Sequence, residues 1–150
     1  MGLFSRLAQS ARVRTHAILI VEDEPLLAFD NEHALAHAGY HVVDTVDRYE
    51  HAVDAMALGG IDLVIADIRL PGMRDGIAVA RHAASLDIPV LLSTAACPPE
   101  AQAFALGWLA KPYGPRDLVR TIAVIDAVLA GQAPRLLPET LSLFLTPSDP

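Results

Sequence analysis

Short runs of β-type residues alternate with longer helical patterns along this 150-residue chain, and this alternation constrains the fold more than any other feature. Such alternation is typical of βα units built on a parallel sheet. Three of the runs are almost purely apolar, as expected for strands that are covered on both faces. The pattern therefore predicts a doubly wound α/β sandwich with five parallel strands. The expected strands are residues 17–21, 41–46, 62–66, 89–93 and 108–110, and the expected helices are 25–38, 49–58, 76–86, a brief 99–106, and 115–130.

Polar side chains follow four of these strands at the point where each strand ends. Ligands of such sheets bind outside the carboxyl ends of the strands, where the strand order switches. If the first and third strands are neighbours, three carboxylates converge there, and like charges so close repel one another unless a cation lies among them. A hard divalent cation with oxygen ligands, preferably Mg²⁺, would relieve that repulsion. The strand-end residues are Glu22 and Asp23, then Asp67, then Thr94, then Lys111.

Lys111 is the only lysine of the chain, which has ten arginines. An ammonium is a compact charge on a flexible stem and suits a single anionic oxygen in a tight pocket. Together with the hydroxyl of Thr94, Lys111 would face the acids from the other side. This layout predicts a phosphoryl group carried on a carboxylate, with its oxygens shared between Mg²⁺, an ammonium and a hydroxyl.

The strand-end motifs resemble those of the receiver domains of two-component response regulators. The matching segments are residues 18–25 (ILIVEDEP), 62–72 (DLVIADIRLPG), 89–95 (PVLLSTA) and 111–113 (KPY). Each is weak alone, but four in the right order at the right strand ends are specific. The resemblance covers roughly residues 16–130 and implies a flavodoxin-like strand order, 2-1-3-4-5.

Roles for individual residues follow from this resemblance. It implies that Asp67 is the phosphoacceptor and that Mg²⁺ is held by Glu22, Asp23, Asp67 and the backbone carbonyl of Arg69. Thr94 is implied as the switch hydroxyl and Lys111 as the phosphoryl-binding lysine, with a cis bond between Lys111 and Pro112. Trp108 occupies the position of the aromatic residue that rotates inward on phosphorylation.

Three features depart from the usual pattern of these receivers. Lys111 follows Thr94 by only seventeen positions, so the fourth helix should be short, with Pro98 and Pro99 fixing its entry. Trp108 is bulkier than the aromatic residue usual at its position. The loop from Asp67 to Gly76 is one residue longer than the commonest spacing.

The chain divides into an N-terminal tail at 1–15, a receiver domain at 16–131 and an apolar C-terminal extension at 132–150. Neither flank is long enough for a DNA-binding domain or an effector enzyme, which predicts output through contact with another protein. The last helix carries a wide apolar face, and the extension is too apolar for a solvated linker. It is expected to pack onto the domain or onto a second copy, with a homodimer through both elements as one arrangement. Two interpretations of the N-terminal tail remain open, a helix with one apolar face or a frayed end. The apolar face of such a helix would consist of Leu3, Phe4, Leu7, Ala8 and Ala11.

Composition narrows the functional classes. No apolar run approaches the ~18–20 residues that span a bilayer, and residues 17–21 are too short for a signal-peptide core. The single cysteine, Cys97, excludes an internal disulfide and a multi-cysteine zinc site. The net charge of −7 argues against a nucleic-acid surface. These features predict a cytoplasmic protein without nucleic-acid contact, and membrane contact by the tail is not expected.

The functional prediction is a single-domain response regulator phosphorylated on Asp67 by a histidine kinase or histidine phosphotransfer protein. It would relay the phosphoryl group or bind a downstream protein, and would catalyse at most its own phosphorylation and dephosphorylation. One alternative is a phosphoaspartate-forming hydrolase of the haloacid dehalogenase kind, although Asp23 is followed by Glu24 and Pro25 rather than by that family's second aspartate. The other is a relict receiver that acts as a phosphorylation-independent binding module.

Overall fold

A single sheet organises the computed structural model, which describes residues 15–134 and 136–144. Its strand order is β2-β1-β3-β4-β5-β6. The elements in chain order are β1 (Ala17–Val21), α2 (Pro25–His37), β2 (His41–Val46), α3 (Tyr49–Ala57), β3 (Leu63–Asp67), α4 (Gly76–Ser85), β4 (Val90–Thr94), the 3-10 helix η1 (Pro99–Ala103), β5 (Gly107–Ala110), α5 (Pro115–Leu129) and β6 (Leu141–Leu143).

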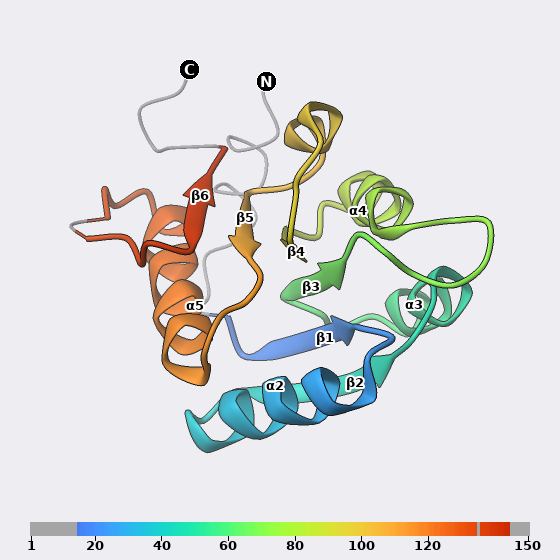
Figure 1. The fold of residues 1–150 in the computed structure, drawn as a ribbon, viewed down its shortest axis with the longest axis horizontal. Helices are drawn as coiled ribbons and strands as arrows, with labels where there is room; N and C mark the ends of the chain where they lie inside the picture. The colour runs from blue at the N-terminus through green and yellow to red at the C-terminus, as the bar shows by residue number, and fades with distance from the viewer. Residues whose placement is uncertain (1–14, 135, 145–150) are drawn as a thin grey trace.

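The first five strands are parallel and β6 is antiparallel. Helices α2 and α5 cover one face of the sheet, and α3 and α4 cover the other (Figure 1). The predicted α/β sandwich with a parallel sheet is confirmed. The expected count of five strands is wrong, because a sixth strand from the C-terminal extension lies beside β5.

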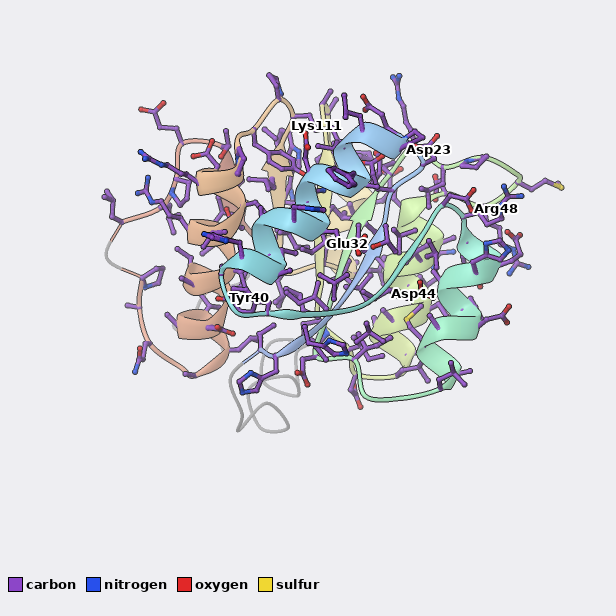
Figure 2. The ribbon with its side chains drawn as sticks, turned by 90° about the horizontal axis from the view of Figure 1, so that it is seen from below. Asp23, Glu32, Tyr40, Asp44, Arg48 and Lys111 are labelled. Carbon is purple, nitrogen blue, oxygen red and sulfur yellow. The ribbon has the colours of Figure 1, made fainter. Side chains whose placement is uncertain are left out.

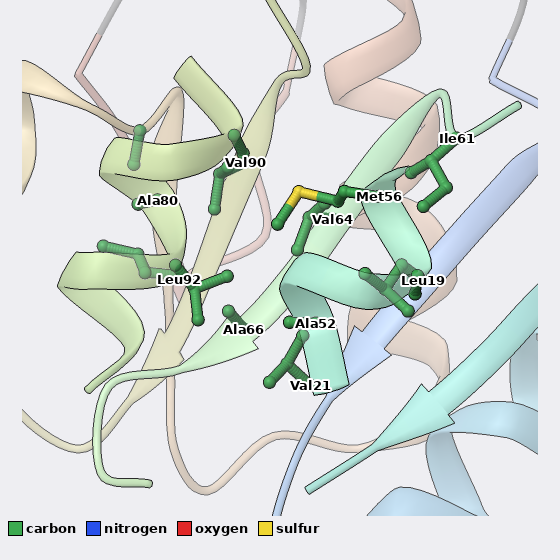
Figure 3. Close-up of a cluster of buried hydrophobic side chains, with 14 of the residues drawn as sticks. Leu19, Val21, Ala52, Met56, Ile61, Val64, Ala66, Ala80, Val90 and Leu92 are labelled. Carbon is green, nitrogen blue, oxygen red and sulfur yellow. The ribbon is translucent and has the colours of Figure 1, made fainter. Parts of the chain in front are cut away.

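Alternating side chains of the central strands supply two separate cores, because successive residues of a strand point to opposite faces. Leu19 and Val21 of β1 belong to the core under α3 and α4, which Figure 3 shows with Met56 and Leu92. Ile18 and Ile20 belong to the core under α2 and α5. Since β1, β3 and β4 are buried almost throughout, they hold the strand ends that carry the polar residues in fixed positions.

Strand β6 covers the outer edge of β5, which would otherwise present unpaired backbone groups. Hydrogen bonds extend the pairing at both ends, from the Ala110 N–H to the Thr140 carbonyl and from the Phe144 N–H to the Leu106 carbonyl, each at 2.8 Å. Leu141, 5% exposed, packs into the core under α5, so part of the apolar extension does pack onto the domain. The register pairs Gly107 with Leu143, Trp108 with Ser142 and Leu109 with Leu141.

The connection between β4 and β5 is short. The expected brief helix is a single 3-10 helix that follows Pro98 and ends four residues before Gly107. Pro98 and Pro99 stand at the cap and the first position, where proline is tolerated and fixes the entry of the helix, and 3-10 geometry is typical of such short pieces. Within 15–134 and 136–144, no helix combines the length and apolar character required to cross a bilayer. The apolar residues of the N-terminal tail, such as Leu3 and Phe4, lie outside the described residues.

Candidate functional site

Four strand ends meet at one edge of the sheet and bring the predicted site residues together. Glu22 follows β1 directly, Asp67 ends β3, Thr94 ends β4, and Lys111 follows β5. The strands are neighbours in register, with Val21 beside Ala66 and Thr94 beside Ala110. Figure 2 shows Asp23 and Lys111 at the same end of α2, with Tyr40 at the opposite end.

Three carboxylates converge at this edge. Glu22, Asp23 and Asp67 each offer an oxygen, and these oxygens lie within 4.8 Å of one another. Glu22 is 4% exposed and Asp67 7%, whereas Asp23 is exposed to solvent. Among residues 15–134 and 136–144, Asp23 has no hydrogen-bond or ion-pair partner. The adjacency of the first and third strands therefore produces the acid cluster that the sequence predicts.

The ammonium of Lys111 bridges two of these acids. Its Nζ donates to Oε1 of Glu22 at 2.8 Å and to Oδ2 of Asp67 at 3.1 Å. Burial raises the pKa of the Glu22 carboxyl, and the hydrogen bond from Lys111 opposes only part of that rise. Burial alone would lower the pKa of Lys111, but its hydrogen bonds to Glu22 and Asp67 outweigh burial and the pKa is raised. Lys111 is thus charged at neutral pH, and three carboxylates face one cation.

Backbone contacts hold Asp67 from two directions. The N–H of Arg69 donates to Oδ1 of Asp67 at 3.1 Å, which fixes the oxygen that Lys111 does not contact. The first residue of α4, Gly76, packs directly on the Asp67 backbone, and its N–H donates to the Ile68 carbonyl at 2.8 Å. A Cβ on Gly76 would collide with the Asp67 carbonyl oxygen. The need for this close approach explains a glycine at the start of an α-helix.

Thr94 is buried, and its hydroxyl is bonded to a backbone carbonyl rather than to an acid. Its Oγ1 donates to the Ala96 carbonyl at 3.1 Å. The Thr94 carbonyl accepts two hydrogen bonds, one from the N–H of Lys111 and one from Nε1 of Trp108, both at 2.9 Å. Trp108 is half-buried, and its hydrogen bond to Thr94 joins the indole to the backbone of β4. Asp23, Asp67, Arg69, Thr94 and Lys111 line one cavity of about 390 Å³.

The sequence-based predictions assign no role to a cluster of polar side chains beside Lys111, formed by Tyr113, Asn31 and Ser93. The hydroxyl of Tyr113 lies 2.9 Å from Nδ2 of Asn31 and 3.3 Å from Oγ of Ser93. Burial raises the pKa of this tyrosine. Tyr113 follows the Lys111–Pro112 bond, which is cis as the resemblance implies, and anchors this segment to α2 and β4. The sequence feature that could have indicated this cluster is Asn31, a polar residue at helical spacing between the apolar Ala28 and Leu35. In the structure all three are buried on the core face of α2.

Comparison with known proteins places this geometry in a family. Residues 18–123 match the model of the response regulator receiver domain. The "Transcriptional regulatory protein PdtaR" of Mycobacterium tuberculosis is 35% identical over 111 residues, which cover 70% of this chain. The chain spans about half of that relative's length, 54%.

Solved structures share the fold. A putative response regulator from Chloroflexus aurantiacus is 32% identical with a TM-score of 0.67, and the match covers 76% of this chain and 99% of that one. The response regulator protein TrrA from Thermotoga maritima, solved in complex with Mg(2+)-BeF, is 28% identical with a TM-score of 0.66, covering 72% and 96%. Sequence, fold and the arrangement of the strand ends agree, and the chain belongs to the response regulator receiver domain family.

Proposed function

We propose that Asp67 accepts a phosphoryl group from a histidine kinase or histidine phosphotransfer protein and that the phosphorylated domain signals to another protein. The observation that carries this proposal is the environment of Asp67. One of its oxygens is held by Lys111 and the other by the Arg69 N–H, inside an acid cluster at the strand ends. A carboxylate held in this way presents a fixed lone pair to an incoming phosphorus atom.

The proposed reaction involves only Asp67 and the phosphohistidine of the donor protein. A carboxylate oxygen of Asp67 forms a bond to phosphorus while the phosphorus–nitrogen bond of the phosphohistidine breaks, and the imidazole leaves with that electron pair. The product adds about −1.5 to −2 charge to a site that already holds Glu22 and Asp23. Lys111, at 3.1 Å from Oδ2 of Asp67, is placed to move its hydrogen bond to a phosphoryl oxygen. Thr94 must rotate its hydroxyl away from the Ala96 carbonyl to contact another one.

The donor set at this edge suits Mg²⁺. Hard cations prefer carboxylate and carbonyl oxygens, and three acidic side chains gather here around a single ammonium. Glu22, Asp23, Asp67 and the backbone carbonyl of Arg69 would hold the ion. When bound, Mg²⁺ supplies positive charge that offsets the acids and the phosphoryl oxygens.

An exposed apolar patch lies beside this site and suits the approach of a protein phosphodonor. Leu26 is 70% exposed and Phe29 is 56% exposed, both on α2. Leu26 also lines a cavity of about 410 Å³, together with Lys111, Pro112 and Tyr113. Exposed apolar side chains around a hollow mark protein contact sites. We infer that the donor protein contacts this patch while its phosphohistidine reaches Asp67.

Labelling by a small phosphodonor with Mg²⁺ tests the proposal. We expect the wild-type chain to take up one phosphoryl group and Asp67→Asn to take up none, because a neutral amide does not attack phosphorus. Asp75→Asn is the matched control, since it makes the same chemical change in the same loop and asparagine still caps α4. Labelling of Asp67→Asn at the wild-type level would show that another residue is the acceptor.

The same experiment separates the two alternatives. Continuous turnover of the phosphodonor, without stable labelling, would indicate a hydrolase, to which the family match gives no support. A wild-type chain that binds neither phosphodonor nor beryllofluoride would indicate a relict pocket. Stable labelling confined to Asp67 supports the receiver function alone.

A further inference from the structure

The C-terminal strand β6 is short and only partly buried. It is three residues long, it lies at the edge of the sheet, and only its first residue, Leu141, is buried. Ser142 is exposed, and Leu143 and Phe144 are half-buried. Short edge elements with little buried surface open at lower free energy than the central strands of a sheet. Strand β6 is therefore expected to open more easily than the central strands β1, β3 and β4.

Strand β5 is shaped to receive β6. A Cβ on Gly107 would lie 2.6 Å from the Ser142 carbonyl oxygen, a distance that real Cβ atoms do not show. It would also lie 3.3 Å from Cδ2 of Leu143. Glycine at this position lets the two backbones approach. This close approach shows that β6 pairs with β5 in one defined register.

Trp108 connects this pairing to the candidate site. Its backbone pairs with Ser142 of β6. Its indole Nε1 donates to the Thr94 carbonyl at 2.9 Å, and the same oxygen accepts from the N–H of Lys111. A single residue thus contacts both β6 and the Thr94 carbonyl, which also accepts the N–H of Lys111.

We propose that β6 is a releasable output strand whose attachment to β5 is set by the phosphorylation state of Asp67. The proposal rests on the proposed function. In the present state the Thr94 hydroxyl donates to Ala96, Trp108 is fixed to Thr94, and β6 is seated. When Thr94 and Lys111 close on a phosphoryl group, the Thr94 carbonyl moves with them. Trp108 then loses its acceptor or shifts with it, and the pairing with β6 weakens.

Thermodynamic linkage makes the coupling reciprocal. If a phosphoryl group at Asp67 favours release of β6, then any change that releases β6 must raise the affinity of the site for a phosphoryl analogue, by up to the same factor. Such coupling factors are typically about 5–150-fold. The inference can therefore be tested from both ends, without knowledge of the partner that reads β6.

Hydrogen exchange of the β5–β6 amides tests it from the site. The amides of Ala110 and Phe144 report on β6, because they donate to Thr140 and Leu106 across the pair. The amide of Asp62, which donates to the Ala17 carbonyl at 2.8 Å, is the control. We expect Mg²⁺ with beryllofluoride to speed exchange of the first two about fivefold or more and to leave the third unchanged. Bound beryllofluoride with unchanged exchange at Ala110 and Phe144 would overturn the proposal and leave the proposed function intact.

Gly107→Ala tests the same coupling by disturbing the pairing of β5 with β6, and Gly114→Ala is the matched control. The added methyl meets the Ser142 carbonyl in the first variant and no atom within 4 Å in the second. We expect Gly107→Ala to bind beryllofluoride with Mg²⁺ about fivefold or more tightly than wild type, and Gly114→Ala to bind like wild type. Equal or weaker binding by Gly107→Ala would overturn the coupling. Absence of beryllofluoride binding in the wild type would overturn the proposed function and this inference together.

Discussion

Replacing Gly76 by alanine should lower both the stability of the protein and its rate of labelling, although Gly76 is not one of the proposed site residues. Gly76 begins α4, and an added Cβ would lie against the carbonyl oxygen of Asp67, 2.6 Å from its carbonyl carbon and 2.7 Å from the Ile68 Cα. All three are backbone atoms at the end of β3, so none can rotate away as a flexible side chain would. Either the start of α4 or the backbone of Asp67 must move.

Two effects of opposite sign determine how much the substitution changes the free energy of unfolding. Alanine is favoured over glycine by about 1 kcal/mol in a helix interior, which is the upper limit of the gain at this first helical position. Forcing a methyl group into a packed site typically costs about 1–3 kcal/mol, and a collision with backbone belongs at or beyond the upper end of that range. We therefore expect a net loss of about 2 kcal/mol in the free energy of unfolding. For a domain of this size that corresponds to a Tm lower by roughly 6–10 °C.

Thermal unfolding followed by circular dichroism, together with the initial rate of labelling by a small phosphodonor, measures both consequences. Displacement of a reacting group by a fraction of an ångström slows a reaction substantially, so we expect labelling about tenfold or more slower. Gly114→Ala is the control, because its methyl group would meet no atom within 4 Å. A Gly76→Ala protein that melts at or above the wild-type Tm and is labelled at the wild-type rate would refute the packing argument.

Three further predictions concern the charges of the site. Glu22→Gln with Asp23→Asn should lose Mg²⁺ binding by calorimetry, and retention of wild-type affinity would contradict the proposed metal site. In the presence of a metal chelator, the raised pKa of Glu22 means that folding favours its protonated form. The contribution of Glu22 to the free energy of unfolding is therefore full below its unfolded pKa of 4.5, and it is lost as the pH rises through the folded pKa, so that Tm falls. Glu22→Gln alone should flatten that fall in Tm, and an unchanged pH profile would show that Glu22 does not cause it. Lys111→Arg should fold and bind Mg²⁺ but show a smaller beryllofluoride-induced shift in partner affinity than wild type, because a guanidinium fork misplaces the charge; an equal shift would show that the lysine is not required.

The geometry of the site could be predicted from the sequence because it depends on strand ends. Strands buried on both faces leave a strong apolar signal, so the residues that follow them could be located to within one position. β3 and β4 each begin one residue later than expected, and Asp67 and Thr94 are their last residues rather than the ones after them. Convergence of Glu22, Asp23 and Asp67 then required only that β1 and β3 be neighbours.

Features that depend on contacts between distant segments could not be predicted from the sequence. Strand β6 has only three residues, and its apolar pattern suits packing on the domain or on a second copy equally well. The bond from Trp108 to the Thr94 carbonyl depends on the direction of an indole, which no spacing reveals. The contact between Asn31 and Tyr113 joins residues 82 positions apart, and a buried asparagine on a helix is its only trace in the sequence.

Trp108 is the only tryptophan in the chain. Its indole N–H bond to Thr94 places the protein's dominant ultraviolet fluorophore between the proposed phosphoryl site and β6. Emission excited near the red edge of the protein absorption band therefore originates from this one position, without an attached dye. A shift in its emission wavelength on phosphorylation would report solvent reaching the indole in real time, in unlabelled protein and on the timescale of a stopped-flow mixer.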